Sequence, residues 1–164
     1  MMTRTGLGYD IHRLVSGRKL VLGGETILFE KGLLGHSDAD VLVHAACDGL
    51  LGAAGLGDIG EHFPDSDPRY RDMYSIEMLT VVYRKVVENG WSLINMDATV
   101  FAQAPRILPY KRRMAVRMAD SMAVDHRVIN IKATTAEGLG AIGKGEGIAA
   151  MCLVLLGAAR SDPP

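Results

Sequence analysis

The chain has 164 residues, which is enough for one globular domain with its own apolar core. Its 18 basic and 19 acidic side chains give a net charge of −1, which argues against a nucleic-acid-binding surface. Cys47 and Cys152 lie far apart in the sequence, so a disulfide scaffold and a cysteine-rich zinc site are both excluded.

The first half of the chain is predicted to hold several strands and one helix. A weak alternation up to about Leu14 predicts a strand, and KLVLGGETILF at 19–29 predicts two short strands around a Gly-Gly turn. The pattern becomes helical from Asp38 to about Ala54, and Ser37 or Asp38 is the expected N-cap.

The second half continues this mixture of helices and strands. The segment at 147–157 fits either a strand or a buried helix, and its position after a glycine-rich turn favours a strand. The other expected elements are a helix at 75–89, a strand at 91–103, a basic amphipathic helix at 108–123 and a strand at 128–135.

This order of elements predicts an α/β fold, an α+β sandwich of ferredoxin-like type with helices on one face of a mixed sheet. We expect one domain at residues 1–158 and a loose tail at 159–164. The other sheet face needs a partner, and self-association is the simplest one. The longest apolar stretch, Ile148–Leu156, is too short to span a membrane, and the first residues lack the apolar run of a secretory signal. We therefore expect a cytoplasmic protein.

Asp10-Ile11-His12 is the sharpest candidate for chemistry. Residues two apart on a strand point to the same side, so Asp10 and His12 could grip one cation, and His44 on the following helix could complete the site. One carboxylate and two imidazoles suit Zn²⁺ with one coordination position left open, as in catalytic sites. The alternative is that His44 is a hydrogen-bonded core residue unrelated to the Asp-x-His pair.

Two further segments carry clusters of polar side chains. HSDAD at 36–40 precedes the first helix, where anions are favoured, and the alternative is a simple helix cap. GDIGEHFPDSDP at 57–68 is predicted to be an acidic loop that could bind hydroxyl groups or a cation, or a plain solvated turn.

Two segments of the second half could contact an anion or a flat ring. AQAPRILP at 102–109 is either a pocket for a base or an ordinary strand-to-helix turn. KATTAEGLGAIGKGEG at 132–147 offers hydroxyls, the carboxylate of Glu137 and Lys144 among glycines. Its GxGxxG string is weak evidence for a dinucleotide fold, because only 21 residues follow Gly143.

The same segments, in the same order, resemble the 2-C-methyl-D-erythritol 2,4-cyclodiphosphate synthase family. The matching strings are GYDIH, EKGLLGHSDADVLVHAACDGLLGAAGLGDIGEHFPDSDP, AQAPRILP, KATTAEGLG and GKGEGIAA, which run over nearly the whole chain. The resemblance implies that the 2-phosphate of 4-diphosphocytidyl-2-C-methyl-D-erythritol 2-phosphate attacks the β-phosphorus, so that CMP leaves and a cyclic diphosphate forms. It also implies a homotrimer with active sites between subunits, acting in the non-mevalonate route to isoprenoid precursors.

By position, the resemblance also implies metal ligands and catalytic groups. Asp10, His12 and His44 match zinc ligands, and Glu137 matches the ligand of a second divalent ion, Mg²⁺ or Mn²⁺. His36 and Thr135 match groups that stabilise the transition state. The implied substrate contacts are Asp10, His12, His36, Ser37, Asp58, Ile59, Gly60, Phe63, Asp65, Ala102, Arg106, Ile107, Leu108, Ala133, Thr134, Thr135, Glu137 and Lys144.

Two other function classes fit parts of the pattern. Clusters of His and Asp also occur in metal-dependent phosphohydrolases, which would release a linear product instead of a cyclic one. A trimeric nucleotide-binding module without turnover is disfavoured by the presence of the complete set of candidate metal ligands.

The chain departs from the family pattern at the expected centre of the trimer. Ala141 stands where an aromatic residue is common, and Lys144 where Arg is common; Tyr9 and Met151 match the same region. We therefore expect an isoprenoid diphosphate to bind on the trimer axis weakly or not at all.

Overall fold

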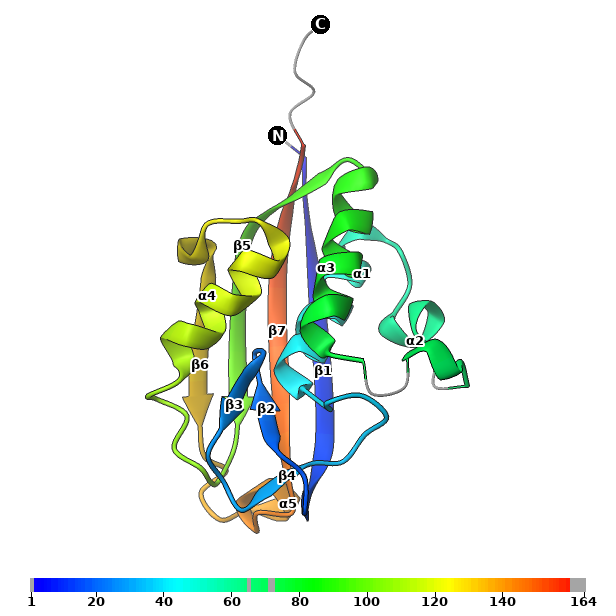
Figure 1. Cartoon of the computed structure of the whole chain (residues 1–164). Coiled ribbons are helices and arrows are strands. Elements are labelled where there is room, and N and C mark those ends of the chain that lie inside the picture. Colours follow the sequence, from blue (N-terminus) through cyan, green and yellow to red (C-terminus); the bar gives the residue numbers. More distant parts are fainter. Residues whose placement is uncertain (1, 65, 71–72, 160–164) are drawn as a thin grey trace, which may run out of the picture.

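The computed structural model describes residues 2–64, 66–70 and 73–159. Its centre is a five-stranded sheet in the order β4-β1-β7-β5-β6 (Figure 1). Neighbouring strands are antiparallel except β5 and β6, which run parallel. The sheet strands are β1 (Thr3–Ser16), β4 (Lys31–Leu33), β5 (Trp91–Phe101), β6 (Ile129–Thr134) and β7 (Gly147–Ala158). The mixed sheet expected from the sequence is confirmed, and so is the strand at 147–157.

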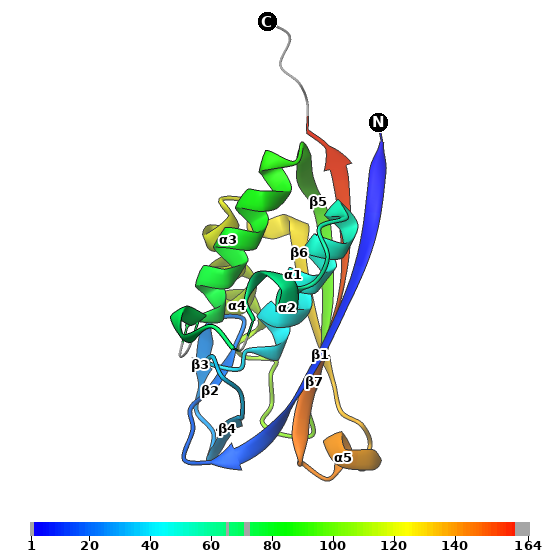
Figure 2. The same ribbon diagram turned by 90° about the vertical axis from the view of Figure 1, so that its right-hand side faces the viewer.

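Three long helices cover one face of this sheet, as Figure 2 shows in side view. They are α1 (Val41–Ala54), α3 (Ser75–Glu88) and α4 (Lys111–Met122). The predicted hairpin is also confirmed as β2 (Leu20–Leu22) and β3 (Glu25–Ile27). Shorter elements that the sequence did not predict are β4, α2 (Ile59–His62), α5 (Gly140–Gly143) and 3₁₀ turns at Pro68–Tyr70 and His126–Val128.

The start of α1 differs from the expectation in a way that bears on function. The helix begins after Asp40, and neither Ser37 nor Asp38 caps it, because Ala39 has a left-handed φ of 58° that no continuing helix allows. Asp40 is fully buried and accepts the backbone N–H groups of Leu42 and Val43, and also those of Gly23 and Gly24 in the β2–β3 turn. One carboxylate therefore ties the hairpin to the first turn of α1.

Glycines let α1 lie directly on β1. A Cβ atom placed on Gly8 would lie 1.9 Å from the backbone oxygen of Ala45, and one on Gly6 would lie 2.0 Å from that of Gly49. No side chain fits in such a gap, so the helix backbone and the strand backbone are in contact. This close approach fixes the distance between side chains on β1 and those in the first turns of α1.

The opposite face of the sheet is apolar and uncovered in the single chain. Leu7, Tyr9 and Ile11 on β1 alternate outward with exposures of 47–60%, and Met151 and Leu153 on β7 face outward with exposures of 39% and 50%. Tyr9 lies opposite Met151, and Leu7 opposite Leu153, so the five side chains form one continuous patch. The uncovered face is thus confirmed, whereas the assembly that covers it and the ferredoxin-like classification stay predictions.

Among the described residues, no helix combines the length and the apolar character that a membrane crossing requires. The predicted tail at 159–164 lies outside the described residues except for Ala159.

Candidate active site

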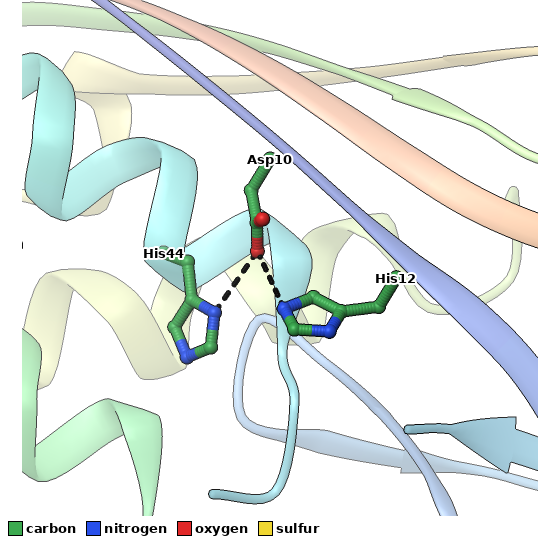
Figure 3. Close-up of side chains that lie close together, drawn as sticks. All are labelled: Asp10, His12 and His44. Carbon is green, nitrogen blue, oxygen red and sulfur yellow. Dashed lines mark hydrogen bonds and ion pairs between the residues drawn. The ribbon is translucent and has the colours of Figure 1, made fainter. Parts of the chain in front are cut away.

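Asp10, His12 and His44 meet where β1 passes the first turn of α1. Asp10 and His12 are two residues apart on β1, so both point toward the helical layer, and His44 reaches them from α1 (Figure 3). Oδ2 of Asp10 lies 3.0 Å from Nε2 of His12 and 2.9 Å from Nδ1 of His44. The three ligand atoms lie within 4.8 Å of one another, which is the spacing of a metal-binding cluster.

The surroundings of His12 decide which of its nitrogens is free. Its Nδ1 lies 2.6 Å from the backbone oxygen of Leu34, which can only accept a hydrogen bond, so Nδ1 carries the proton. The neutral ring then presents the bare lone pair of Nε2 to the carboxylate of Asp10. A cation bound between these two acceptors would relieve the repulsion between their lone pairs.

The pKa shifts agree with a preference for positive charge between these groups. Burial alone would raise the pKa of Asp10, but the hydrogen bonds and charges of His12 and His44 outweigh it and hold that pKa well below its usual range. The hydrogen bond to Asp10 raises the pKa of His12 although burial opposes the shift. A carboxylate and imidazole nitrogens around one point are a donor set that fits Zn²⁺.

A pocket of about 780 Å³ opens over this cluster, a volume within the range of small-molecule sites. Besides the three candidate ligands, its lining includes five of the substrate contacts that the sequence predicts: His36, Ser37, Ile59, Gly60 and Phe63. Pro64, Ser66, Asp67 and Pro68 of the predicted acidic loop also line it. The sequence did not indicate the remaining lining residues, which are Gly35, Asp48, Tyr70 and Met78.

The wall formed by residues 57–64 is more ordered than the predicted acidic loop. Asp58 caps the short helix α2 by accepting the N–H of Glu61 at 3.0 Å, and the N–H of Ile59 donates to Oδ1 of Asp48 at 2.8 Å. Burial raises the pKa of Asp48, although the hydrogen bond from Ile59 opposes the shift. The i,i+4 spacing of His44 and Asp48 on α1 was the sequence signal for this residue. Asp65, a predicted substrate contact, lies outside the described residues.

The segment that carries His36 and Ser37 is held by Arg18, a residue that the sequence did not indicate. Its guanidinium donates to the backbone oxygens of Gly35 at 3.2 Å and Ser37 at 2.7 Å. His36 is exposed at the edge of the pocket, whereas Ser37 is buried. The positively charged side chain of Arg18 therefore anchors the backbone of the predicted phosphate-facing segment.

A second group of predicted residues gathers at the carboxyl ends of β5 and β6. The N–H of Ala102 donates to the oxygen of Thr134 at 3.0 Å, and the hydroxyl of Thr135 donates to Oε1 of Glu137 at 2.6 Å. The group comprises Ala102, Arg106, Ile107, Leu108, Ala133, Thr134, Thr135 and Glu137, with Lys144 at the end of α5. In the part of the chain that the structure describes, none of these residues lines the 780 Å³ pocket. Within one chain, the predicted contacts thus form two separate groups.

Comparison with known proteins matches the chain along nearly all of its length. The YgbB family profile covers residues 3–157. The chain is 57% identical over 153 residues to the 2-C-methyl-D-erythritol 2,4-cyclodiphosphate synthase of Desulfatibacillum aliphaticivorans, with 93% of this chain and 99% of that protein covered. The enzyme of the same name from Nitrosomonas eutropha is 56% identical, with 97% and 94% covered.

Solved structures agree with the sequence matches. The bifunctional IspDF from Campylobacter jejuni superposes with a TM-score of 0.92 at 44% identity; the match covers 96% of this chain and 42% of that longer protein. A CDP complex of IspF from Plasmodium falciparum superposes with a TM-score of 0.85 at 30% identity, covering 96% of this chain and 97% of that one.

Proposed function

This chain belongs to the YgbB family, and on that basis we propose that it converts 4-diphosphocytidyl-2-C-methyl-D-erythritol 2-phosphate to 2-C-methyl-D-erythritol 2,4-cyclodiphosphate and CMP. This is a lyase reaction of isoprenoid precursor synthesis. The observation that carries the proposal is the convergence of the Asp10 carboxylate with His12 and His44 in a pocket of about 780 Å³. A metal-dependent phosphohydrolase, the alternative raised by the sequence, is not favoured by the family match.

We assign Zn²⁺ to Asp10, His12 and His44, where a bound metal supplies Lewis acidity and a template for the folded substrate. The nucleophile is the substrate's own 2-phosphate, so the protein must position two anionic groups and exclude water instead of activating it. His36, on the segment that Arg18 anchors, donates a hydrogen bond to a phosphate oxygen as negative charge develops.

The second group of residues supplies the cytidine half of the site. Residues 102–108, with Ala133 and Thr134, hold the cytidine, and Glu137 holds a second divalent ion beside the diphosphate. Thr135 donates to the reacting phosphate once its hydroxyl leaves Glu137, to which it is bonded at 2.6 Å. Relatives with bound CDP are consistent with a cytidine nucleotide as the recognised group.

We propose that a homotrimer joins the two groups across subunit boundaries. The support is twofold: the groups lie apart within one chain, and the patch of Leu7, Tyr9, Ile11, Met151 and Leu153 is apolar and exposed. A cytoplasmic location stays a prediction.

An end-point assay with the diphosphocytidyl substrate, followed by phosphorus NMR, tests the reaction. Cyclic diphosphate and CMP are expected, with activity lost on chelation and regained with Zn²⁺. A linear hydrolysed product would instead support the phosphohydrolase.

A histidine pair supplies the matched variants. His44→Ala removes a proposed ligand and is expected to abolish zinc binding and turnover, whereas His126→Ala changes a histidine in a surface turn with its side chain 51% exposed. Full zinc content in the His44 variant would refute the metal assignment.

A further inference from the structure

The first residue of α3 touches the candidate metal centre from the side opposite Asp10. Ser75 is fully buried, and its Oγ lies 2.9 Å from Nε2 of His44. Its own hydroxyl donates to Oδ1 of Asp38, and its backbone N–H donates to Oδ2 of the same carboxylate at 3.1 Å. A chain of polar contacts thus runs from Asp38 through Ser75 to the ring of His44.

The donors and acceptors in this series of contacts determine which nitrogen of the His44 ring carries the proton. The carboxylate of Asp38 only accepts, so the single hydroxyl proton of Ser75 is used in the bond to Asp38. The Oγ atom can then only accept from His44, which places the ring proton on Nε2. The other nitrogen, Nδ1, is left bare and faces Asp10 Oδ2 at 2.9 Å, so this state requires the Ser75 contact to outweigh the competing pull of the Asp10 carboxylate on the ring proton.

Ser37 would impose the opposite state. Its Oγ lies 3.3 Å from the same Nε2 and already accepts the N–H of Ala39 at 3.0 Å, so its free proton points to donation toward His44. Donation from Ser37 would leave Nε2 bare and put the ring proton on Nδ1, where it blocks a metal. Ser75 is the closer of the two hydroxyls, and its orientation is set by Asp38.

We propose that Asp38 and Ser75 form a positioning pair that locks His44 in the Nε2–H tautomer and so presents Nδ1 to the metal. In the same way, the backbone oxygen of Leu34 holds the ring proton of His12 on one nitrogen and leaves the other free to bind a metal. Hydrogen-bond partners of this kind set ring orientation and ligand basicity, and their loss typically lowers metal affinity about 10–100-fold. The inference rests on the proposed metal site, although its structural claim concerns the metal-free ring.

The pair also frees Ser37 for the substrate. Because Ser75 satisfies Nε2 of His44, the Ser37 hydroxyl can turn to a phosphate without disturbing the ligand. Asp38 follows Ser37 directly in the chain, and its own N–H donates to the oxygen of Met73 at 3.4 Å. The carboxylate is therefore fixed between the phosphate-facing segment and the start of α3.

Nitrogen NMR of the metal-free protein at about pH 9, where imidazoles are neutral, reports the tautomer directly. The wild type is expected to show His44 protonated on Nε2. Asp38→Asn places an amide where the carboxylate accepts; the amide can donate to Ser75, whose proton then turns to Nε2, so the Nδ1–H tautomer is expected. Ser75→Ala removes the acceptor and is expected to give a mixture of the two tautomers.

Zinc affinity, measured by competition with a chelator, should fall about 10–100-fold in both variants. Thr80→Ala is the matched control, because its hydroxyl lies on the same helix and donates to the backbone oxygens of Ile76 and Ser121, away from His44. Ser37→Ala should leave the tautomer unchanged.

The wild-type spectrum alone can overturn the proposal, by showing His44 protonated on Nδ1. A tautomer that follows Ser37 and not Ser75, or zinc affinity unchanged in both Asp38→Asn and Ser75→Ala, would overturn it as well. If the wild type shows the Nε2–H tautomer but binds no zinc, the metal assignment fails while the hydrogen-bond relay stands.

Discussion

A methyl group added at Gly8 should disturb the proposed metal centre although Gly8 is not one of its candidate ligands. Its Cβ would lie 1.9 Å from the backbone oxygen of Ala45, the residue next to His44 on α1. Real Cβ contacts essentially never fall below 3.0 Å, so the helix must retreat by at least 3.0 − 1.9 = 1.1 Å. Metal–ligand distances tolerate about 0.2 Å, so the retreat pulls His44 out of bonding range of an ion held by Asp10 and His12.

Two effects of Gly8→Ala can be measured separately. Overpacking at this contact should lower the free energy of unfolding by about 1–3 kcal/mol. Zinc affinity, by chelator competition on the folded variant, should fall by at least about tenfold, as for changes that misorient a ligand.

Gly52→Ala is the matched control on the same helix. An added Cβ there meets nothing within 4 Å, and replacing a helical Gly by Ala favours the helix by about 1 kcal/mol. This variant should keep its zinc and gain stability. If Gly8→Ala bound zinc as tightly as the wild type, the contact between α1 and β1 would not be what sets the position of His44.

Four further outcomes are expected. Glu137→Gln should abolish turnover and leave zinc content, by elemental analysis, unchanged, because Glu137 lies outside the Asp10–His12–His44 cluster; equal loss of zinc would place it in that site. Leu153→Glu puts a charge on the exposed apolar patch, so light scattering should show monomers instead of a trimer. Turnover should be lost and zinc kept. A wild-type protein that is active as a monomer would contradict an active site shared between subunits. Burial raises the pKa of Cys152 to about 12 and that of Cys47 well above its usual value, so both stay protonated at pH 8 and should react with a thiol reagent only after unfolding. With Ala141 in place of an aromatic ring, about 2 kcal/mol of apolar contact per ring is lost, and calorimetry should show no tight binding of farnesyl diphosphate; a clear isotherm at low micromolar ligand would refute this.

Local patterns were sufficient to predict the sheet, the long helices and the Asp10–His12 pair. Alternation on a strand places these two side chains on one side whatever the rest of the chain does. The start of α1 was misplaced because the deciding contacts of Asp40, to the N–H groups of Gly23 and Gly24, come from another element.

The roles of Asp38 and Ser75 were beyond sequence reasoning for the same reason. Asp38 reads as a helix cap next to α1, yet its carboxylate binds the start of α3, 37 residues away. Arg18 donates to two backbone oxygens, and because every residue carries such an oxygen, the sequence does not indicate which ones are bound. Long-range polar contacts of this kind become visible only once the elements are placed.

The buried carboxylate of Asp40 has a consequence for how the molecule opens. It joins four amides: those of Gly23 and Gly24 in the β2–β3 turn, and those of Leu42 and Val43 in the first turn of α1. Neither the hairpin turn nor the first turn of α1 can detach without leaving a buried hydrogen-bond acceptor short of its donors. In native-state hydrogen exchange, these amides should therefore open together as one cooperative unit with a shared free energy. Since His44 lies in that unit, releasing this proposed metal ligand by local fraying would cost as much free energy as releasing the whole hairpin.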